Sequence, residues 1–478
     1  MDSGLFGGNA TLGTAAMLIV GVLGLLAFSF LFLKIAPHWV LAILLSLAVL
    51  QGFRPIGYIS IFLLVCLAAV PRLIRDYRFS WRDWMLYVFA AILLRQVLSA
   101  AWSPVLGAVA HAALSTFCVV VIYLLARLAV RSEPSLSRVL TVAAPFVLLQ
   151  AVATIVFRLF PSVQDWYFGL GIARWLSEPG VESIASNPQN VTDPGKAGGF
   201  FLNGNIAALF LGVVACVYLY SFAITRALSS LAIAVVMIAG VVATGSKSGL
   251  GLAIALPILA AVVMLASRNR RLAILSLIGA AFIGIVSVAA VAIGNPALLE
   301  VSIRTLGDRG LLWTYAAQQF PLNPITGMGY GGWLDRLDAN FVSIFGPDRP
   351  YDDFPPHNLF IQAWADAGIV LALLVIAAVV ISVARGVRFA VQISARSGRW
   401  SFLEGGVILA ALLWFPLHGM LDTTAFYGEN RTLAFYALVL AIASERIVAR
   451  RRDQNDTSSS EPALLPQSEL ATSASGAK

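Results

Sequence analysis

The sequence predicts an all-α polytopic membrane protein, and three observations support this fold class. Of its 478 residues, 59% are hydrophobic and 12% are charged, whereas soluble domains average about 45–50% apolar and about 25% charged residues. The mean hydropathy is +0.86. The apolar residues also gather in about 12–13 runs that approach the ~20 residues needed to cross a bilayer.

These runs define one integral membrane domain over residues 1–452. The second and third runs are short and meet near Arg54, which leaves the total at 12 or 13. The tail, 453–478, is rich in Ser, Glu, Asp and Gln and is predicted to be disordered. We place the spans near 14–33, 39–53, 56–71, 84–101, 105–129, 138–160, 200–224, 228–244, 249–267, 271–293, 358–384, 403–421 and 431–448.

The cationic residues predict the orientation of the chain. The net charge is +8, but the basic residues lie between apolar spans rather than on one polar face, which argues against nucleic acid as a partner and favours membrane lipid. About twenty Lys and Arg residues fall on one side and about ten on the other, so the richer side is predicted to be cytoplasmic, with the C-terminus. The richer loops contain Arg72, Arg75, Arg78, Arg82, Arg131, Arg138, Arg268, Arg270, Arg271, Arg385, Arg388, Arg396, Arg399, Arg450, Arg451 and Arg452.

Two long segments, 161–199 and 294–357, fall on the opposite, extracytoplasmic side. Compact connections usually run about 4–6 residues, and loops longer than about 15 are commonly functional or disordered. Both segments contain tryptophan, proline and glycine, and 304–320 has a partly helical pattern. We therefore expect ordered caps here rather than linkers.

The strongest candidate for a reacting group is His357. It follows Pro355 and Pro356, which cannot continue a helix from upstream, and it precedes Asn358, which can cap the next helix. The imidazole is thus expected at the mouth of a membrane helix, where water-borne and lipid-borne groups meet. A histidine beside prolines can also be purely structural, and that alternative stays open.

Two further motifs begin membrane helices on the same side. In Gly199–Asn205, Asn205 can orient a sugar hydroxyl or a phosphate oxygen, or the asparagines can simply cap the helix. In Thr244–Gly249, Lys247 sits between small residues at a helix N-terminus, a setting that favours anions. A snorkelling lysine in a tight turn is the alternative.

The segment 304–333 adds two arginines and a glycine-rich stretch. Arginine forks match phosphate oxygens in a bidentate manner, which makes Arg304 and Arg309 candidates for binding a diphosphate. The glycines of 323–333 permit close backbone approach or a sharp turn. Ordinary solvated arginines are the competing interpretation.

Four other groups are weaker candidates. Arg95 lies within a span, where a charge is costly and a functional partner is the default expectation. His418 lies near the outer end of another span, close to Asp422. Asp352 and Asp353 form a weak signal for a hard cation, which needs a larger set of oxygen ligands. We therefore expect neither a metal nor another cofactor.

The ordered motifs GFFLNGN, TGSKSG, RGLLW, NPITGMGYGGW and PHNLFIQAWADAGIVLALL resemble the O-antigen ligase and polysaccharide polymerase superfamily. These are bacterial inner-membrane proteins that use undecaprenyl-diphosphate-linked glycans. The resemblance covers roughly 195–385. One departure is Lys247, where the family usually has arginine; lysine keeps the charge but lacks the planar fork.

The resemblance implies a fold related to the C-type glycosyltransferases and a metal-independent, inverting transfer on the periplasmic side. An acceptor hydroxyl would attack the anomeric carbon of the lipid-linked sugar. The implied roles are a base for His357, diphosphate binding for Arg309, Arg304 and Lys247, and orientation of substrate for Asn205 and Asn358. Arg95 and His418 have no assigned role.

The acceptor separates two functions that the sequence leaves open. Transfer to lipid A–core would define a ligase, and transfer to another carrier-linked repeat would define an O-antigen or exopolysaccharide polymerase. A transporter of polysaccharide or lipid is the alternative from another class, and it predicts inverted repeats around a midplane site. A scaffold of an export complex is a further possibility if the site proves inactive.

Overall fold

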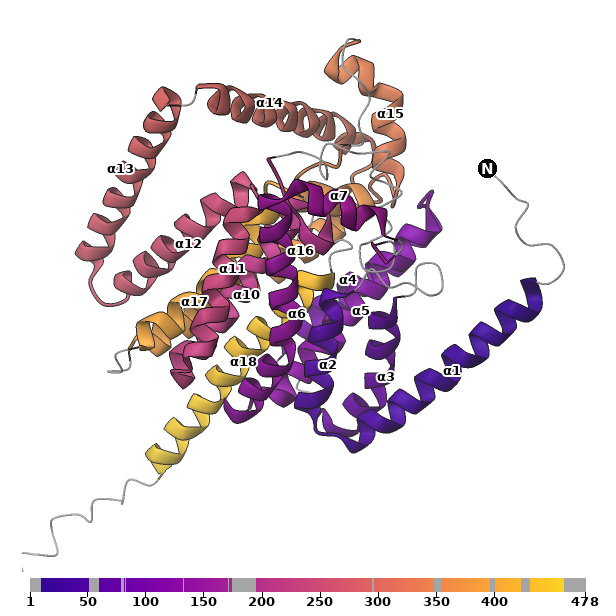
Figure 1. The fold of residues 1–478 in the computed structure, drawn as a ribbon, viewed down its shortest axis with the longest axis vertical. Helices are drawn as coiled ribbons and strands as arrows, with labels where there is room; N and C mark the ends of the chain where they lie inside the picture. The colour runs from indigo at the N-terminus through magenta and orange to yellow at the C-terminus, as the bar shows by residue number, and fades with distance from the viewer. Residues whose placement is uncertain are drawn as a thin grey trace, which may run out of the picture.

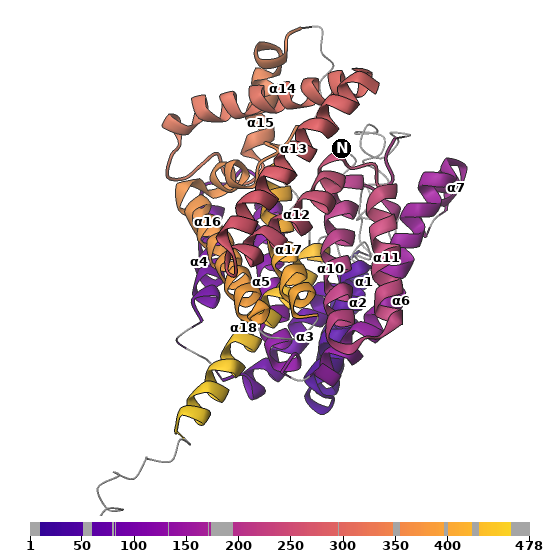
Figure 2. The ribbon, with the colours of Figure 1, turned by 90° about the vertical axis from the view of Figure 1, so that its left-hand side faces the viewer.

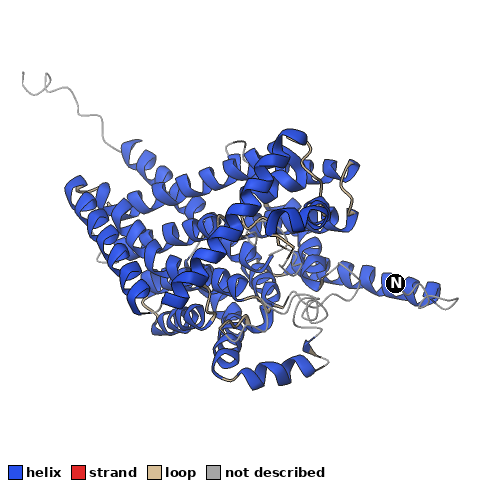
Figure 3. Cartoon of the chain, turned by 90° about the horizontal axis from the view of Figure 1, so that it is seen from above, coloured by secondary structure: helices blue, strands red, loops and turns tan. Residues whose placement is uncertain are grey.

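The computed structural model describes residues 10–50, 60–78, 81, 83–131, 133–170, 172–173, 195–294, 296–347, 354–395, 400–422 and 430–459. Within these ranges the chain is built from helices, and no strand occurs among them (Figures 1 and 3). Short turns and 3₁₀ segments join many consecutive helices. The all-α class predicted from the sequence is therefore confirmed.

The bounds of the helices follow the apolar runs closely. The first group is α1 (Ala10–Lys34), α2 (Pro37–Val49), α3 (Ile61–Asp76), α4 (Trp84–Leu98), η1 (Ser99–Ala101), α5 (Leu106–Ala129), α6 (Glu133–Leu159) and α7 (Pro161–Gly169). The second group is η3 (Gly199–Phe201), α10 (Gly204–Thr225), α11 (Leu228–Ala243), α12 (Lys247–Ala266) and α13 (Arg270–Gly294). The last group is α14 (Pro296–Gln319), η4 (Phe320–Leu322), α15 (Gly332–Phe345), α16 (Leu359–Ser394), α17 (Ser401–Gly419) and α18 (Asn430–Ser459).

Seven helices in the described part of the chain are long and apolar enough to cross a membrane. Three shorter apolar helices accompany them, Gly21–Lys34, Pro37–Val49 and Leu228–Ala243. The protein is thus a multi-pass membrane protein, while the expected total of about 12–13 spans stays a prediction.

Helix α10 lies at the centre of the bundle. In its most apolar window 83% of the residues are buried, against 22% in α12. A helix that is apolar all round and buried needs neighbours on every side, and α10 packs against α6, α11, α12, α17 and α18. Helices α12 and α13 lie at the edge of the bundle, away from α1 (Figure 1).

A buried charge network joins four helices at one end of the bundle. The Asp83 carboxylate, at the start of α4, accepts from Arg127 of α5 and from Nη2 of Arg385 of α16 at 3.0 Å. Arg127 Nε also lies 2.6 Å from Glu445 Oε1 of α18. Buried charges are tolerated when they are paired and hydrogen-bonded in this way. We call this end the arginine end and the opposite one the histidine end.

Helices α14 and α15 lie across the histidine end, far from the C-terminal end of α18 (Figure 2). They belong to the segment 294–357 that the sequence predicts as an ordered cap, and the helical pattern expected at 304–320 falls within α14. Of the other long segment, 161–199, the structure describes α7, 172–173 and 195–199.

Three boundaries differ from the expected ones. Helix α16 continues to Ser394, beyond the predicted end near 384, and α3 begins at Ile61 rather than near 56. Helix α18 reaches Ser459, so residues 453–459, predicted as the start of a disordered tail, are helical. Residues 460–478 lie outside the described ranges.

Candidate active site

The segment before α16 is held in place by two tryptophan side chains. The indole nitrogen of Trp313 donates to the carbonyl of Pro356 at 2.9 Å, and that of Trp333 donates to the carbonyl of Phe354 at 2.8 Å. These bonds anchor the extended chain on either side of the two prolines. His357 follows directly and has a φ of 48°. A non-glycine residue in this region carries strain of roughly 1–3 kcal/mol, which persists only where neighbours fix it.

His357 and His418 face a shared carboxylate, Asp422. Nδ1 of His357 lies 3.9 Å from Oδ1 of Asp422, whose side chain is 6% exposed. His418, at the end of α17, is fully buried and lies within the electrostatic field of Asp422. Its Nε2 lies 3.4 Å from the hydroxyl of Ser248 in α12. A chain reversal after α17 thus brings two imidazoles and one acid together.

Arg309 completes this group from α14. It lies one helical turn before Trp313, so the two side chains share the face that packs on the segment before His357. Partial burial lowers the pKa of the Arg309 guanidinium, and the negative charge of Asp422 opposes part of that shift. We call His357, His418, Asp422, Arg309 and Ser248 the histidine cluster.

Three helices begin around the histidine cluster. The N-cap of α12, Ser246, donates its hydroxyl to Oδ1 of Asn205 in the first turn of α10 at 2.7 Å. The N-cap of α16, Asn358, accepts from the amides of Phe360 and Ile361 at 2.9 and 3.2 Å. Its Nδ2 lies 3.4 Å from the carbonyl of Met420, directly after α17. Helix N-termini carry partial positive charge, so this arrangement favours an anion.

The cap predicted at Asn358 is therefore present, and Asn205 lies beside the cluster. Lys247 is the first residue of α12, next to Ser248, and its side chain is exposed. These three candidates stand at the histidine end together with His357, His418 and Arg309. Their roles toward a substrate stay predictions.

Arg304 stands apart from them. Its side chain is 68% exposed and its Nη2 lies 3.3 Å from Glu300 in the previous helical turn. Arg304 and Arg309 are five positions apart in α14, which turns their side chains about 140° from one another at 3.6 residues per turn. The structure thus favours Arg309 over Arg304 as a partner of the cluster.

The partners of Arg95 in the described part of the chain are backbone carbonyls and an indole ring. Its Nε donates to the carbonyl of Ala367 at 2.8 Å, and Nη2 donates to that of Ile325 at 2.6 Å. The guanidinium also lies over the ring of Trp102, 4.6 Å from the centroid. The Arg95 guanidinium donates to backbone carbonyls of the loop 323–331 and of α16, and so it holds this loop against α16.

That loop, 323–331, enters a break in α16. Ala367 and Gly368 have non-helical backbone angles. The backbone groups of α16 that lose their helical hydrogen bonds at this break pair with the loop instead. Ile369 N–H donates to the Pro324 carbonyl at 2.9 Å, and Met328 N–H donates to the Ala365 carbonyl at 2.7 Å. Gly368 has φ 79°, and a Cβ there would collide with the carbonyl oxygen of Ile325. In the loop itself, Gly327 has φ 68°, and a Cβ there would collide with the carbonyl oxygen of Trp364. The close backbone approach expected of the glycines of 323–333 is therefore made to α16 of the same protein.

No group of three or more His, Cys, Asp or Glu side chains able to hold a metal occurs in the described ranges. Asp352 and Asp353, the acids that gave the weak metal signal, lie outside those ranges. Metal independence therefore stays a prediction.

Fold and site together define a polytopic membrane protein with paired histidines, a carboxylate and a partly buried arginine at one end of its bundle. Residues 232–376 match the family model described as O-antigen ligase, and this match supports the resemblance of that region to the O-antigen ligase and polysaccharide polymerase superfamily. No curated protein matches the sequence. The match includes Lys247, Arg309 and His357, whereas His418 and Asp422 lie beyond it.

Asp422 and Ser248 are the members of the cluster that the sequence did not single out. The spacing of Asp422 four residues after His418 was visible. Its contact with His357 was not, because it depends on how α16 and α17 pack. Ser248 stood beside Lys247 without any property that distinguished it from a small turn residue.

Proposed function

We propose that the protein transfers a glycan from an undecaprenyl-diphosphate carrier to an acceptor hydroxyl at the histidine end, predicted to be periplasmic. The observation that carries this proposal is the histidine cluster, which combines a group able to accept a proton with a guanidinium and with helix N-termini. A glycosyl transfer of this kind needs both a base near the acceptor and positive charge near the leaving diphosphate.

His357 is the proposed base. The acceptor oxygen forms a bond to the anomeric carbon, its proton passes to the imidazole, and the bond from that carbon to the diphosphate oxygen breaks. Nδ1 of His357 is the atom nearest to Asp422, so Nε2 is left to face the acceptor. At 3.9 Å, Asp422 would then stabilise the imidazolium that forms by its negative charge.

The departing diphosphate gains negative charge as the bond breaks. Arg309 is the proposed partner for it, because its side chain is partly buried and lies on the face of α14 that meets the His357 segment. Charge-assisted bonds from a fork-shaped guanidinium suit phosphate oxygens. Lys247 and the N-termini of α10 and α12 add positive potential, and Asn205 and Asn358 line the same region.

The ligase and polymerase alternatives differ only in the acceptor. Purified protein is given one radiolabelled undecaprenyl-diphosphate-linked glycan together with either lipid A–core or a second carrier-linked repeat. Label recovered on lipid A–core identifies a ligase, and label in longer carrier-linked glycans identifies a polymerase. Intact donor under both conditions, from correctly folded protein, would contradict the proposed transfer.

A further inference from the structure

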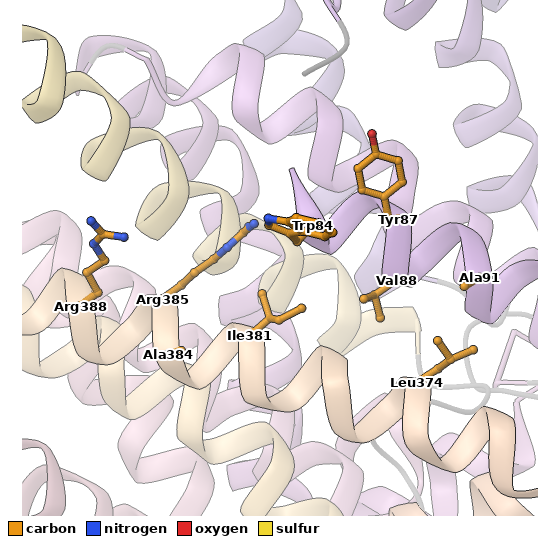
Figure 4. Close-up of a pocket in the computed structure, with 9 residues that line it drawn as sticks. All are labelled: Trp84, Tyr87, Val88, Ala91, Leu374, Ile381, Ala384, Arg385 and Arg388. Carbon is orange, nitrogen blue, oxygen red and sulfur yellow. The ribbon is translucent and has the colours of Figure 1, made fainter. Parts of the chain in front are cut away.

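A groove opens between α4 and α16 near the arginine end (Figure 4). Its volume is about 500 Å³, within the range of about 300–1,000 Å³ that is usual for small-molecule sites. The lining is apolar except at one end, where two arginines stand. The lining residues are Trp84, Tyr87, Val88, Ala91, Leu374, Ile381, Ala384, Arg385 and Arg388.

The groove is long enough to hold an acyl chain. From Leu374 to Arg388, α16 rises about 21 Å at 1.5 Å per residue, about two-thirds of a hydrocarbon core of about 30 Å. The apolar side chains of the lining occupy the inner part of this length, and Arg388 marks its outer end (Figure 4). The polarity therefore changes along the groove as it does along a phospholipid.

The two arginines differ in how they are compensated. Arg385 donates to Asp83, to the hydroxyl of Tyr123 at 2.9 Å and to that of Ser444 at 2.8 Å. Arg388 is exposed, and no ion pair involves it in the described part of the chain. Since the groove has no acidic residue in its lining, Arg388 gives its mouth a positive charge.

Two aromatic side chains, Trp84 and Tyr87, line the groove, and Trp81 contacts Tyr87. Trp81 and Trp84 are 78% and 68% exposed. Their ring centroids lie 6.5 and 6.1 Å, respectively, from the ring centroid of Tyr87. Exposed tryptophan and tyrosine are enriched at the level of the lipid headgroups, where their rings are amphipathic. These rings are therefore expected at the level of the headgroups.

We propose that this groove binds an anionic phospholipid of the leaflet at the arginine end, with an acyl chain between α4 and α16 and its headgroup phosphate at Arg388. Basic pockets between membrane helices recognise anionic headgroups in this way. The donor carrier is the other possible occupant. Its diphosphate would have to lie at the histidine cluster, about 45 Å from Arg388 along α16. That distance is the full thickness of a bilayer with its headgroups, about 40–45 Å, so one lipid headgroup cannot serve both places.

The test uses the full-length protein in a neutral detergent, with native mass spectrometry as the readout and dioleoyl phosphatidylglycerol or dioleoyl phosphatidylcholine as the probe. The wild type should retain phosphatidylglycerol roughly fivefold better, because one basic residue near an anionic headgroup contributes about 1 kcal/mol and about 1.4 kcal/mol corresponds to tenfold in affinity. Arg388→Gln should remove this preference. The matched control is Arg268→Gln, another exposed arginine on the predicted cytoplasmic side, and it should leave the preference intact.

A second pair of variants tests the apolar part. Ala384→Trp fills the groove and should lower retention of both lipids, whereas Val380→Trp, on an exposed position of α16 outside the lining, should not. Equal retention of the two lipids by the wild type, or an unchanged preference in Arg388→Gln, would overturn the proposal. So would displacement of phosphatidylglycerol by equimolar undecaprenyl phosphate, which would make the carrier the occupant. Because the experiment measures only lipid binding, its result does not depend on whether the protein transfers a glycan.

Discussion

Arg309 and Arg304 offer a matched comparison within one helix. Arg309 is partly buried and lies in the field of Asp422, while Arg304 is exposed and paired with Glu300. If Arg309 stabilises the leaving diphosphate, Arg309→Ala removes a donor aimed at developing charge. Loss of one such donor typically costs about 2.7–4 kcal/mol, or roughly 10²–10³-fold in rate. Arg309→Lys keeps the charge without the fork, so its transfer rate should lie between those of the wild type and Arg309→Ala.

The assay is the rate of glycan transfer from a defined lipid-linked donor, measured with purified variants at subsaturating donor. Arg304→Ala is the control and should stay within about twofold of the wild type, as expected for an exposed pair worth about 0–1 kcal/mol. Equal losses in both variants would show that α14 contributes positive charge without the geometry described above. Full activity of Arg309→Ala would remove Arg309 from the site.

Three further outcomes are expected. Asp422→Asn should slow transfer by about 10- to 1,000-fold, because two unit charges ~4 Å apart interact by up to about 4 kcal/mol at an effective dielectric constant of 20; unchanged turnover would disconnect Asp422 from His357. Gly368→Ala should lower stability by at least about 1–3 kcal/mol in thermal unfolding, whereas Gly251→Ala, with open space around its Cβ position, should not. Excess chelator should leave transfer unchanged, and a loss restored by Mg²⁺ would implicate acids such as Asp352 and Asp353.

The sequence predicted the helical class and the start of α16 well, because both depend on local properties. Continuous apolar runs can only be satisfied as helices in a bilayer. The two prolines and Asn358 act within a few residues of each other, so the cap on Phe360 and Ile361 could be expected before its geometry was known.

What the sequence could not supply depends on contacts between distant segments. The backbone partners of Arg95, the carbonyls of Ile325 and Ala367, lie more than two hundred residues away in the sequence and could not be foreseen. Arg304 and Arg309 looked equivalent because their helical phase relative to the bundle was unknown until Trp313 fixed it. Asp422 lies near His357 only because α17 packs against α16.

The central claim is that His357 takes the proton of the acceptor and does not merely shape the site. Its most direct test is single-turnover transfer by His357→Ala, with donor binding measured on the same preparation. Transfer is expected to fall by at least about 10²–10⁴-fold, the usual contribution of a general base, while the donor is still bound. Transfer at the wild-type rate would contradict it.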